Sequence, residues 1–171
     1  MHLIFATLCL STLLLNGGGG VLDVNWSTIQ KTQQKSMAAY PKVLVDGIKK
    51  VKFPVYLSSN YAYNKEMSVV ADKYFYAISF NLDKAMVLFE GDRTFQESVD
   101  ANSPEFKKII EKLKPVEFSQ SEGVRIASYQ RHGVNYSISV ECEQPDKDKR
   151  CTEETFVKAL YSSIIMTGGQ P

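Results

Sequence analysis

Apolar and polar residues alternate most clearly along residues 134–142, VNYSISVEC. One side of this segment is apolar and carries Val134, Tyr136, Ile138, Val140 and Cys142. The other side is polar and carries Asn135, Ser137, Ser139 and Glu141. A period of two is typical of a β-strand with one buried face. Residues 124–131 precede this strand across His132-Gly133, so the pattern predicts a hairpin with a tight turn.

A second hairpin is predicted from two β-prone runs, YFYAISF at 74–80 and AMVLFE at 85–90, which Asn-Leu-Asp-Lys separates. The second run is apolar on both faces, which indicates a central strand. Residues 53–57, FPVYL, predict a short strand, and Pro54 begins it or keeps it at an edge because proline cannot donate to a sheet ladder. Residues 58–71 are rich in polar side chains and predict a loop.

Apolar residues at helical spacing predict three helices. The first begins at Ser27 or Thr28 and ends at Pro41. The second begins at Ser103-Pro104-Glu105, and its apolar stripe comprises Phe106, Ile109, Ile110 and Leu113. The third begins at Thr152, and one of its faces carries Phe156, Ala159, Leu160, Ser163 and Ile164. Together the elements predict an α+β fold: an antiparallel sheet of about five strands, built from two hairpins and an edge strand, with helices packed on one face.

The first residues follow the order of a secretory signal, an apolar run from Leu3 to Leu15 and then glycines at 17–20. The run of about 13 residues is shorter than the roughly 20 that a membrane-spanning helix needs. We therefore expect a signal peptide over residues 1–20, a single α+β domain over 21–167 and a flexible tail over 168–171.

Two features of the N-terminal run leave alternatives open. No Lys or Arg precedes it and glycines replace the usual Ala-x-Ala, so an uncleaved N-terminus is the alternative to export. A lipid anchor on Cys9 is a further alternative, which Leu8 disfavours because a lipobox has a small residue there. In the mature chain we expect no integral membrane segment.

The cysteines agree with export. Cys9 lies in the presumed signal, which leaves Cys142 and Cys151 as a pair that we expect to form a disulfide. A metal site is the alternative; eight residues separate the two and no histidine stands near them, unlike in zinc motifs. Asn25 and Asn135 begin glycosylation acceptor sequences, whose use depends on the host.

Charge and motif content exclude several function classes. With 20 basic and 19 acidic residues and a net charge of +1, the chain has no excess of positive charge for nucleic acid or an anionic membrane. His132 is expected to be solvated in its turn, and G-x-S-x-G is absent, so no catalytic residue is assigned. Asp146 and Asp148 are interleaved with cations that oppose a divalent ion. We expect no metal and no cofactor.

Aromatic side chains are numerous, with nine tyrosines and nine phenylalanines. Five tyrosines gather within one segment: Tyr56, Tyr61, Tyr63, Tyr74 and Tyr76. Exposed tyrosines form amphipathic contact surfaces for proteins or sugars, so these five are the candidate binding residues. The alternative is that Tyr74 and Tyr76 pack beneath a helix while Tyr61 and Tyr63 cover the rim.

These observations favour an exported, non-enzymatic binding or inhibitor-like domain of the periplasm, cell envelope or extracellular space. It would hold a protein or cell-envelope partner by a sheet edge or by the Tyr56–Tyr76 segment. One alternative is a small hydrolase that acts on envelope or extracellular polymers through carboxylates. The other is a structural accessory subunit. A pocket with two acids within catalytic distance would favour the hydrolase, whereas an exposed apolar patch above roughly 600 Å² would favour binding or assembly.

Overall fold

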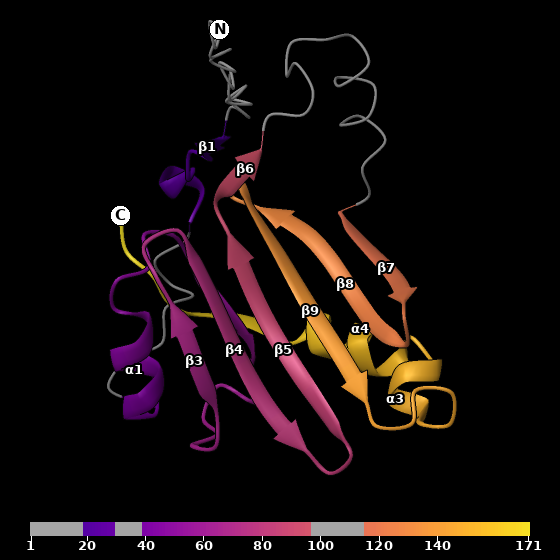
Figure 1. Ribbon diagram of the computed structural model, residues 1–171. Coiled ribbons are helices and arrows are strands. Elements are labelled where there is room, and N and C mark those ends of the chain that lie inside the picture. The colour runs from indigo at the N-terminus through magenta and orange to yellow at the C-terminus, as the bar shows by residue number, and fades with distance from the viewer. Residues whose placement is uncertain (1–18, 30–38, 97–114) are drawn as a thin grey trace, which may run out of the picture.

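A computed structural model of the protein describes residues 19–29, 39–96 and 115–171. This part is rich in β-structure, and its largest element is a six-stranded antiparallel sheet with the strand order β3-β4-β5-β9-β8-β7 (Figure 1). The strands in that order are Ser68–Ala71, Phe75–Leu82, Ala85–Asp92, Val134–Cys142, Val124–Arg131 and Val116–Ser121.

Smaller elements surround this sheet. Two antiparallel pairs join β2 to β10 and β1 to β6. These four strands are β1 (Gly19–Val21), β2 (Val55–Ser58), β6 (Thr94–Gln96) and β10 (Ile164–Gly168). The described helices are short: η1 (Trp26–Thr28), α1 (Lys42–Ile48), α3 (Lys149–Thr152) and α4 (Thr155–Ser162).

Both predicted hairpins are confirmed, and β5 is central because it pairs with β4 on one side and β9 on the other. The β4–β5 connection is shorter than expected, since pairing continues to Leu82 and Ala85 and leaves a two-residue turn. At the β8–β9 turn, His132 and Gly133 have φ angles of 53° and 82°. Positive φ at both positions lets a two-residue turn follow the right-handed twist of its strands.

The large sheet has six strands rather than about five, because β3 and β7 extend it at its two edges. β3 lies in the segment predicted as a loop, and β7 was not predicted at all. Their sequences, SVVA and VEFSQS, are short or poor in apolar residues. Pairing with β4 and β8 therefore establishes these strands, rather than their own pattern. The predicted strand at 53–57 is β2, which pairs with β10 and not with the large sheet.

The C-terminal segment differs from the prediction of one helix that begins at Thr152 and includes Ile164. Asp148 caps α3 instead, and its side chain accepts a hydrogen bond from the backbone N–H of Arg150 at 2.9 Å. Two short helices follow, and Ile164 begins β10. β-branched residues such as those at 164–165 lose side-chain freedom in a helix and fit a strand, and here they pair with β2.

The last residues contact the body of the protein, although the sequence predicts a flexible tail over 168–171. Gly168 is the last residue of β10 and pairs with Val55. The backbone N–H of Gln170 donates to the carbonyl oxygen of Val51 at 3.2 Å. Lys52 Nζ donates to the carbonyl oxygen of Pro171 at 2.7 Å. The end of the chain thus forms several specific contacts.

Three predictions fall wholly or mainly outside the described residues. The helix expected from Ser103 to Leu113 lies there, as do residues 1–18 of the expected signal peptide. Of the helix expected after Ser27, the structure describes η1, while residues 30–38 lie outside.

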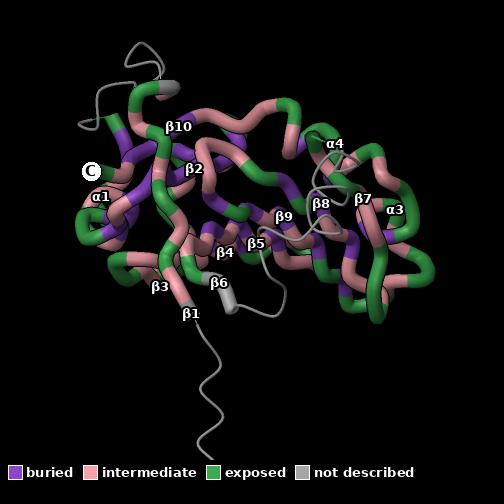
Figure 2. Tube along the Cα trace, turned by 90° about the horizontal axis from the view of Figure 1, so that it is seen from above, coloured by how far each residue is buried: buried purple, intermediate pink, exposed green. Residues whose placement is uncertain are grey.

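The hydrophobic core lies on one face of the large sheet. Figures 1 and 2 show β2, β10, α3 and α4 together on that side, with α1 beside β3. Buried and less buried residues alternate along the strands, as the period of two predicts. The fully buried side chains of the large sheet include Ile78, Phe80, Val87, Phe89, Ile138 and Val140.

Candidate functional site on the large sheet

Two of the five candidate tyrosines belong to the core. The exposed fraction is 2% for Tyr56 and 1% for Tyr76. The Tyr76 hydroxyl accepts from the backbone N–H of Tyr56 at 3.1 Å and donates to its carbonyl oxygen at 3.2 Å. Burial holds the pKa of Tyr76 well above its usual value. Both side chains therefore contact protein groups and not a surface partner.

The other three tyrosines lie at separate places. The Tyr61 ring packs against Phe80, with 5.1 Å between ring centroids, and is half-buried. Tyr63 is 43% exposed and stacks on Tyr40 at 5.1 Å. Tyr74 is half-buried near the opposite end of the β4–β5 hairpin from its turn. The structure thus brings Tyr56 and Tyr76 together but does not gather all five tyrosines into one contact surface.

His132 is only partly exposed, although a fully solvated turn residue was expected. Its ring lies 6.4 Å from that of Tyr56 with an interplanar angle of 21°, and its carbonyl oxygen accepts from the backbone N–H of Asn25 at 3.0 Å. Burial and the neighbouring Arg131 guanidinium lower the pKa of His132. The N-terminal segment packs against the β8–β9 turn, which sequence periodicity alone does not reveal.

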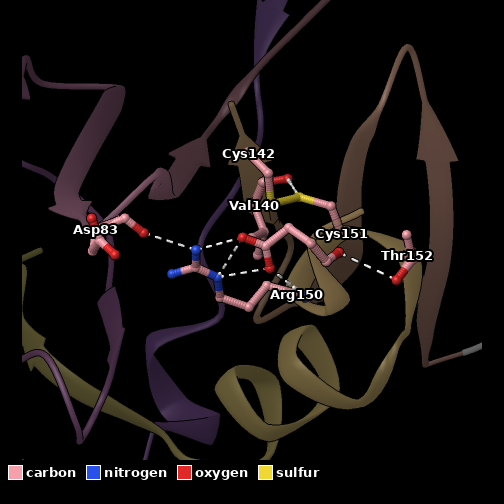
Figure 3. A network of polar contacts seen from close by, with 7 residues as sticks. Asp83, Val140, Cys142, Arg150, Cys151 and Thr152 are labelled. Atoms are coloured by element: carbon pink, nitrogen blue, oxygen red, sulfur yellow. Dashed lines mark hydrogen bonds and ion pairs between the residues drawn. A yellow bond between two sulfur atoms is a disulfide. The ribbon is translucent and has the colours of Figure 1, made fainter. Parts of the chain in front are cut away.

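The disulfide between Cys142 and Cys151 is confirmed, and a polar network surrounds it (Figure 3). Arg150 Nε donates to both carboxylate oxygens of Asp148, at 3.0 and 3.1 Å, and Nη2 donates to the carbonyl oxygen of Asp83 at 2.8 Å. Arg150 of α3 therefore connects the loop after β9, through Asp148, with the β4–β5 turn. This arrangement holds the fold together.

The carboxylates near this network show no sign of acid catalysis. Arg150 lowers the pKa of Asp148 to about 2, and Lys158 lowers the pKa of Glu154. A general acid needs the opposite shift. Within the described ranges, no group of three or more His, Cys, Asp or Glu side chains could hold a metal ion.

The outward face of the large sheet, opposite the core, is the candidate functional site. In Figures 1 and 2 no described helix or strand crosses this face, apart from the β1–β6 pair at one end. Register aligns its residues across the strands; the central row consists of Ser68, Ser79, Leu88, Ser139, Ile126 and Ser119. Small serine side chains beside Leu88 and Ile126 make a face that a partner can approach closely.

Charge on the outward face has one sign. Four carboxylates, Glu90, Asp92, Glu117 and Glu141, occupy outward positions of β5, β7 and β9. No Lys, Arg or His occupies an outward position on any strand of the large sheet. These four carboxylates therefore give the outward strand positions a net negative charge.

Apolar side chains accompany these acids on the outward face. Val70, on edge strand β3, is 65% exposed, the largest value among the exposed large hydrophobic residues. Met86 and Leu88 of β5 and Ile126 of β8 are half-buried by their neighbours. Leu88 and Ile126 flank Ser139, and carboxylates lie in the neighbouring rows, so the face matches a partner segment whose apolar side chains are flanked by cations.

Sequence reasoning missed this face as a site. It identified the polar side of residues 134–142, including Ser139 and Glu141, but treated it as ordinary solvent-facing surface. The absence of lysine and arginine becomes visible only when the outward positions of all six strands are aligned. That alignment needs the strand order, which the pattern along the chain does not supply.

Comparison of the chain with family models, with characterised proteins and with solved structures gave no match. Among the described residues, no helix is both long enough and apolar enough to span a membrane. The geometry of the sheet is therefore the basis for a functional proposal.

Proposed function

We propose that the protein is an exported, non-enzymatic binding domain that holds a protein partner against the outward face of its large sheet. One observation carries the proposal: a six-stranded sheet has a face that no described helix covers. On that face serines and scattered apolar side chains lie among carboxylates, and no cation occupies an outward strand position. Sheets commonly pack a second layer on each apolar face. A partner molecule supplies that layer here.

The partner has a defined chemistry under this proposal. Its contact segment presents an apolar stripe toward Leu88 and Ile126, and lysine or arginine side chains toward Glu90 and Glu141. Opposite charges accelerate encounter and discriminate against acidic partners. Binding is therefore expected to weaken as ionic strength rises, because Glu117 and Glu141 are exposed and screened by salt.

Export is supported by the disulfide and by the N-terminal sequence. A bond between Cys142 and Cys151 persists in an oxidising compartment and is rare in the cytosol. The apolar run from Leu3 to Leu15 has the order of a secretory signal. The partner is accordingly expected among extracellular, periplasmic or envelope proteins.

Charge reversal tests the proposal. Immobilised wild-type protein and a Glu117→Lys/Glu141→Lys variant are compared for capture of proteins from the extracellular and envelope fractions of the source cell. We expect a captured partner whose affinity for the variant is at least about ten-fold weaker. The matched control is Asp146→Lys/Glu153→Lys, which changes the charge equally at exposed positions away from the outward face.

Each outcome is informative. Loss of capture by the Glu117/Glu141 variant alone supports the proposal, provided that its melting temperature is unchanged. Equal capture by all three proteins contradicts it. A lowered melting temperature in the Glu117/Glu141 variant also contradicts it, because the face would then pack against the protein's own chain.

A further inference from the structure

A hollow of about 370 Å³ at one end of the molecule brings together side chains from separate segments. Its lining includes Asp23, Lys52, Lys73, Tyr74 and Arg93. Its volume is near the lower end of the range for small-molecule sites, roughly 300 to 1,000 Å³, and the hollow is shallow and largely open to solvent. Three cations thus share this space with one side-chain carboxylate and with Pro171 at the end of the chain.

Arg93 is held in one position by neutral acceptors. Its Nε and Nη2 donate to the carbonyl oxygen of Leu22 at 3.0 and 2.8 Å, and its Nη1 donates to that of Lys52 at 2.8 Å. No carboxylate within the described ranges forms an ion pair with it. Because a guanidinium has five N–H groups, two remain for a ligand. The charge of Arg93 is therefore fixed in place without a counter-ion.

Tyr74 provides an aromatic surface beside these cations. Lys73 Nζ lies 4.9 Å and Arg93 Cζ lies 5.6 Å from the centre of its ring. The ring is half-buried, so it is held while part of it faces the hollow. Lys73 is exposed, and its ammonium group has no hydrogen-bond acceptor among the residues described. It can turn toward an anion at little energetic expense.

We propose that this hollow binds a small aromatic carboxylate. The carboxylate pairs with Lys73 and with the two remaining N–H groups of Arg93, and the ring packs against Tyr74. Asp23 and the Pro171 carbonyl oxygen, which already accepts from Lys52, lower the positive potential. A singly charged carboxylate therefore fits this charge balance better than a dianionic phosphate.

Titrations followed by the backbone amide resonances of the full chain test the site with three probes: benzoate, acetate and inorganic phosphate. We expect saturable shifts at residues 52, 73 and 93, with benzoate binding at least about five-fold more tightly than acetate because only benzoate has a ring. Phosphate is expected to bind more weakly than benzoate. Lys73→Gln should weaken benzoate binding by about ten-fold, the factor for one charge-assisted hydrogen bond.

Two variants separate specific binding from general attraction. Tyr74→Leu should remove the preference for benzoate over acetate. Lys84→Gln removes the same charge at the far end of the β4–β5 hairpin and should leave binding unchanged. Equal weakening by Lys73→Gln and Lys84→Gln would overturn the proposal, as would the absence of saturable shifts or a benzoate preference that survives in Tyr74→Leu.

Discussion

Gly91 lies in a crowded part of the core, and Gly91→Ala is predicted to lower the free energy of unfolding. Gly91 pairs with Tyr76 on one side and Tyr136 on the other. A Cβ atom there would lie 2.4 Å from Tyr76 Cε1, 2.7 Å from Phe53 Cε2 and 3.0 Å from Tyr136 Cε1. The rings are buried, so they cannot move aside freely. Glycine lets three aromatic rings meet over the central strand.

The expected magnitude follows from two opposing effects. Overpacking a close-packed core costs about 1 to 3 kcal/mol. Alanine also restricts the unfolded chain, which stabilises by about 0.4 to 1 kcal/mol where φ is not left-handed, as at Gly91. The close approaches to buried rings place the overpacking cost toward its upper end, so we predict a net loss of about 2 kcal/mol.

Urea denaturation at constant m value measures this loss. The matched control is Ala77→Val, which enlarges a side chain on the outward face of β4. We expect a change within about 0.5 kcal/mol there, because no described element packs on that face. Stabilisation by Gly91→Ala would refute the packing argument, and a large loss from Ala77→Val would show that the outward face is covered.

Three further predictions concern the remaining contacts of the fold. Cys142→Ser/Cys151→Ser should lower the free energy of unfolding by about 2 to 3 kcal/mol, because the disulfide closes a loop between residues nine positions apart. Urea denaturation measures this loss, and an unchanged free energy of unfolding would contradict a stabilising role. Arg125 is 8% exposed and donates to the carbonyl oxygens of Cys151 and Thr152 at 3.1 and 2.9 Å. Arg125→Met should therefore lower the free energy of unfolding by about 1 to 3 kcal/mol. A melting temperature equal to that of the wild type would show that water satisfies those carbonyl oxygens. Burial lowers the pKa of His132, because the folded state disfavours the protonated imidazole. The stability that neutral His132 contributes is therefore complete above the unfolded pKa of 6.5. It is lost as the pH falls through the lower folded pKa. His132→Gln should therefore flatten the dependence of the urea midpoint on pH between about pH 7 and 5, and an unaltered slope would contradict the shift.

Local sequence patterns predicted the strands along which apolar and polar residues follow one simple pattern. Residues 134–142 alternate strictly, and β9 has those bounds. The apolar run at 85–90 indicated a central strand, and β5 is one. The disulfide between Cys142 and Cys151 was likewise predictable, because these two cysteines are the pair that remains after the presumed signal peptide.

Elements that depend on distant partners were not predictable in the same way. Ile164 fits a helical stripe with Phe156 and Leu160, yet pairing with β2 places it in a strand. β3 and β7 are strands because β4 and β8 present unpaired edges to them. The tyrosine cluster in the sequence divides between core and surface, since Tyr56 and Tyr76 meet through tertiary packing.

A photo-crosslinking amino acid at Ser139 tests the binding account most directly. Ser139 lies on the outward side of β9, between Leu88 and Ile126 in the aligned row. Irradiation in the native extracellular or envelope fraction should yield a discrete covalent adduct with a second protein, identified by mass spectrometry. The same probe at Glu153, away from that face, should yield none. An adduct at Glu153 but not at Ser139, or only intramolecular products at Ser139, would contradict the assignment of the outward face as the binding surface.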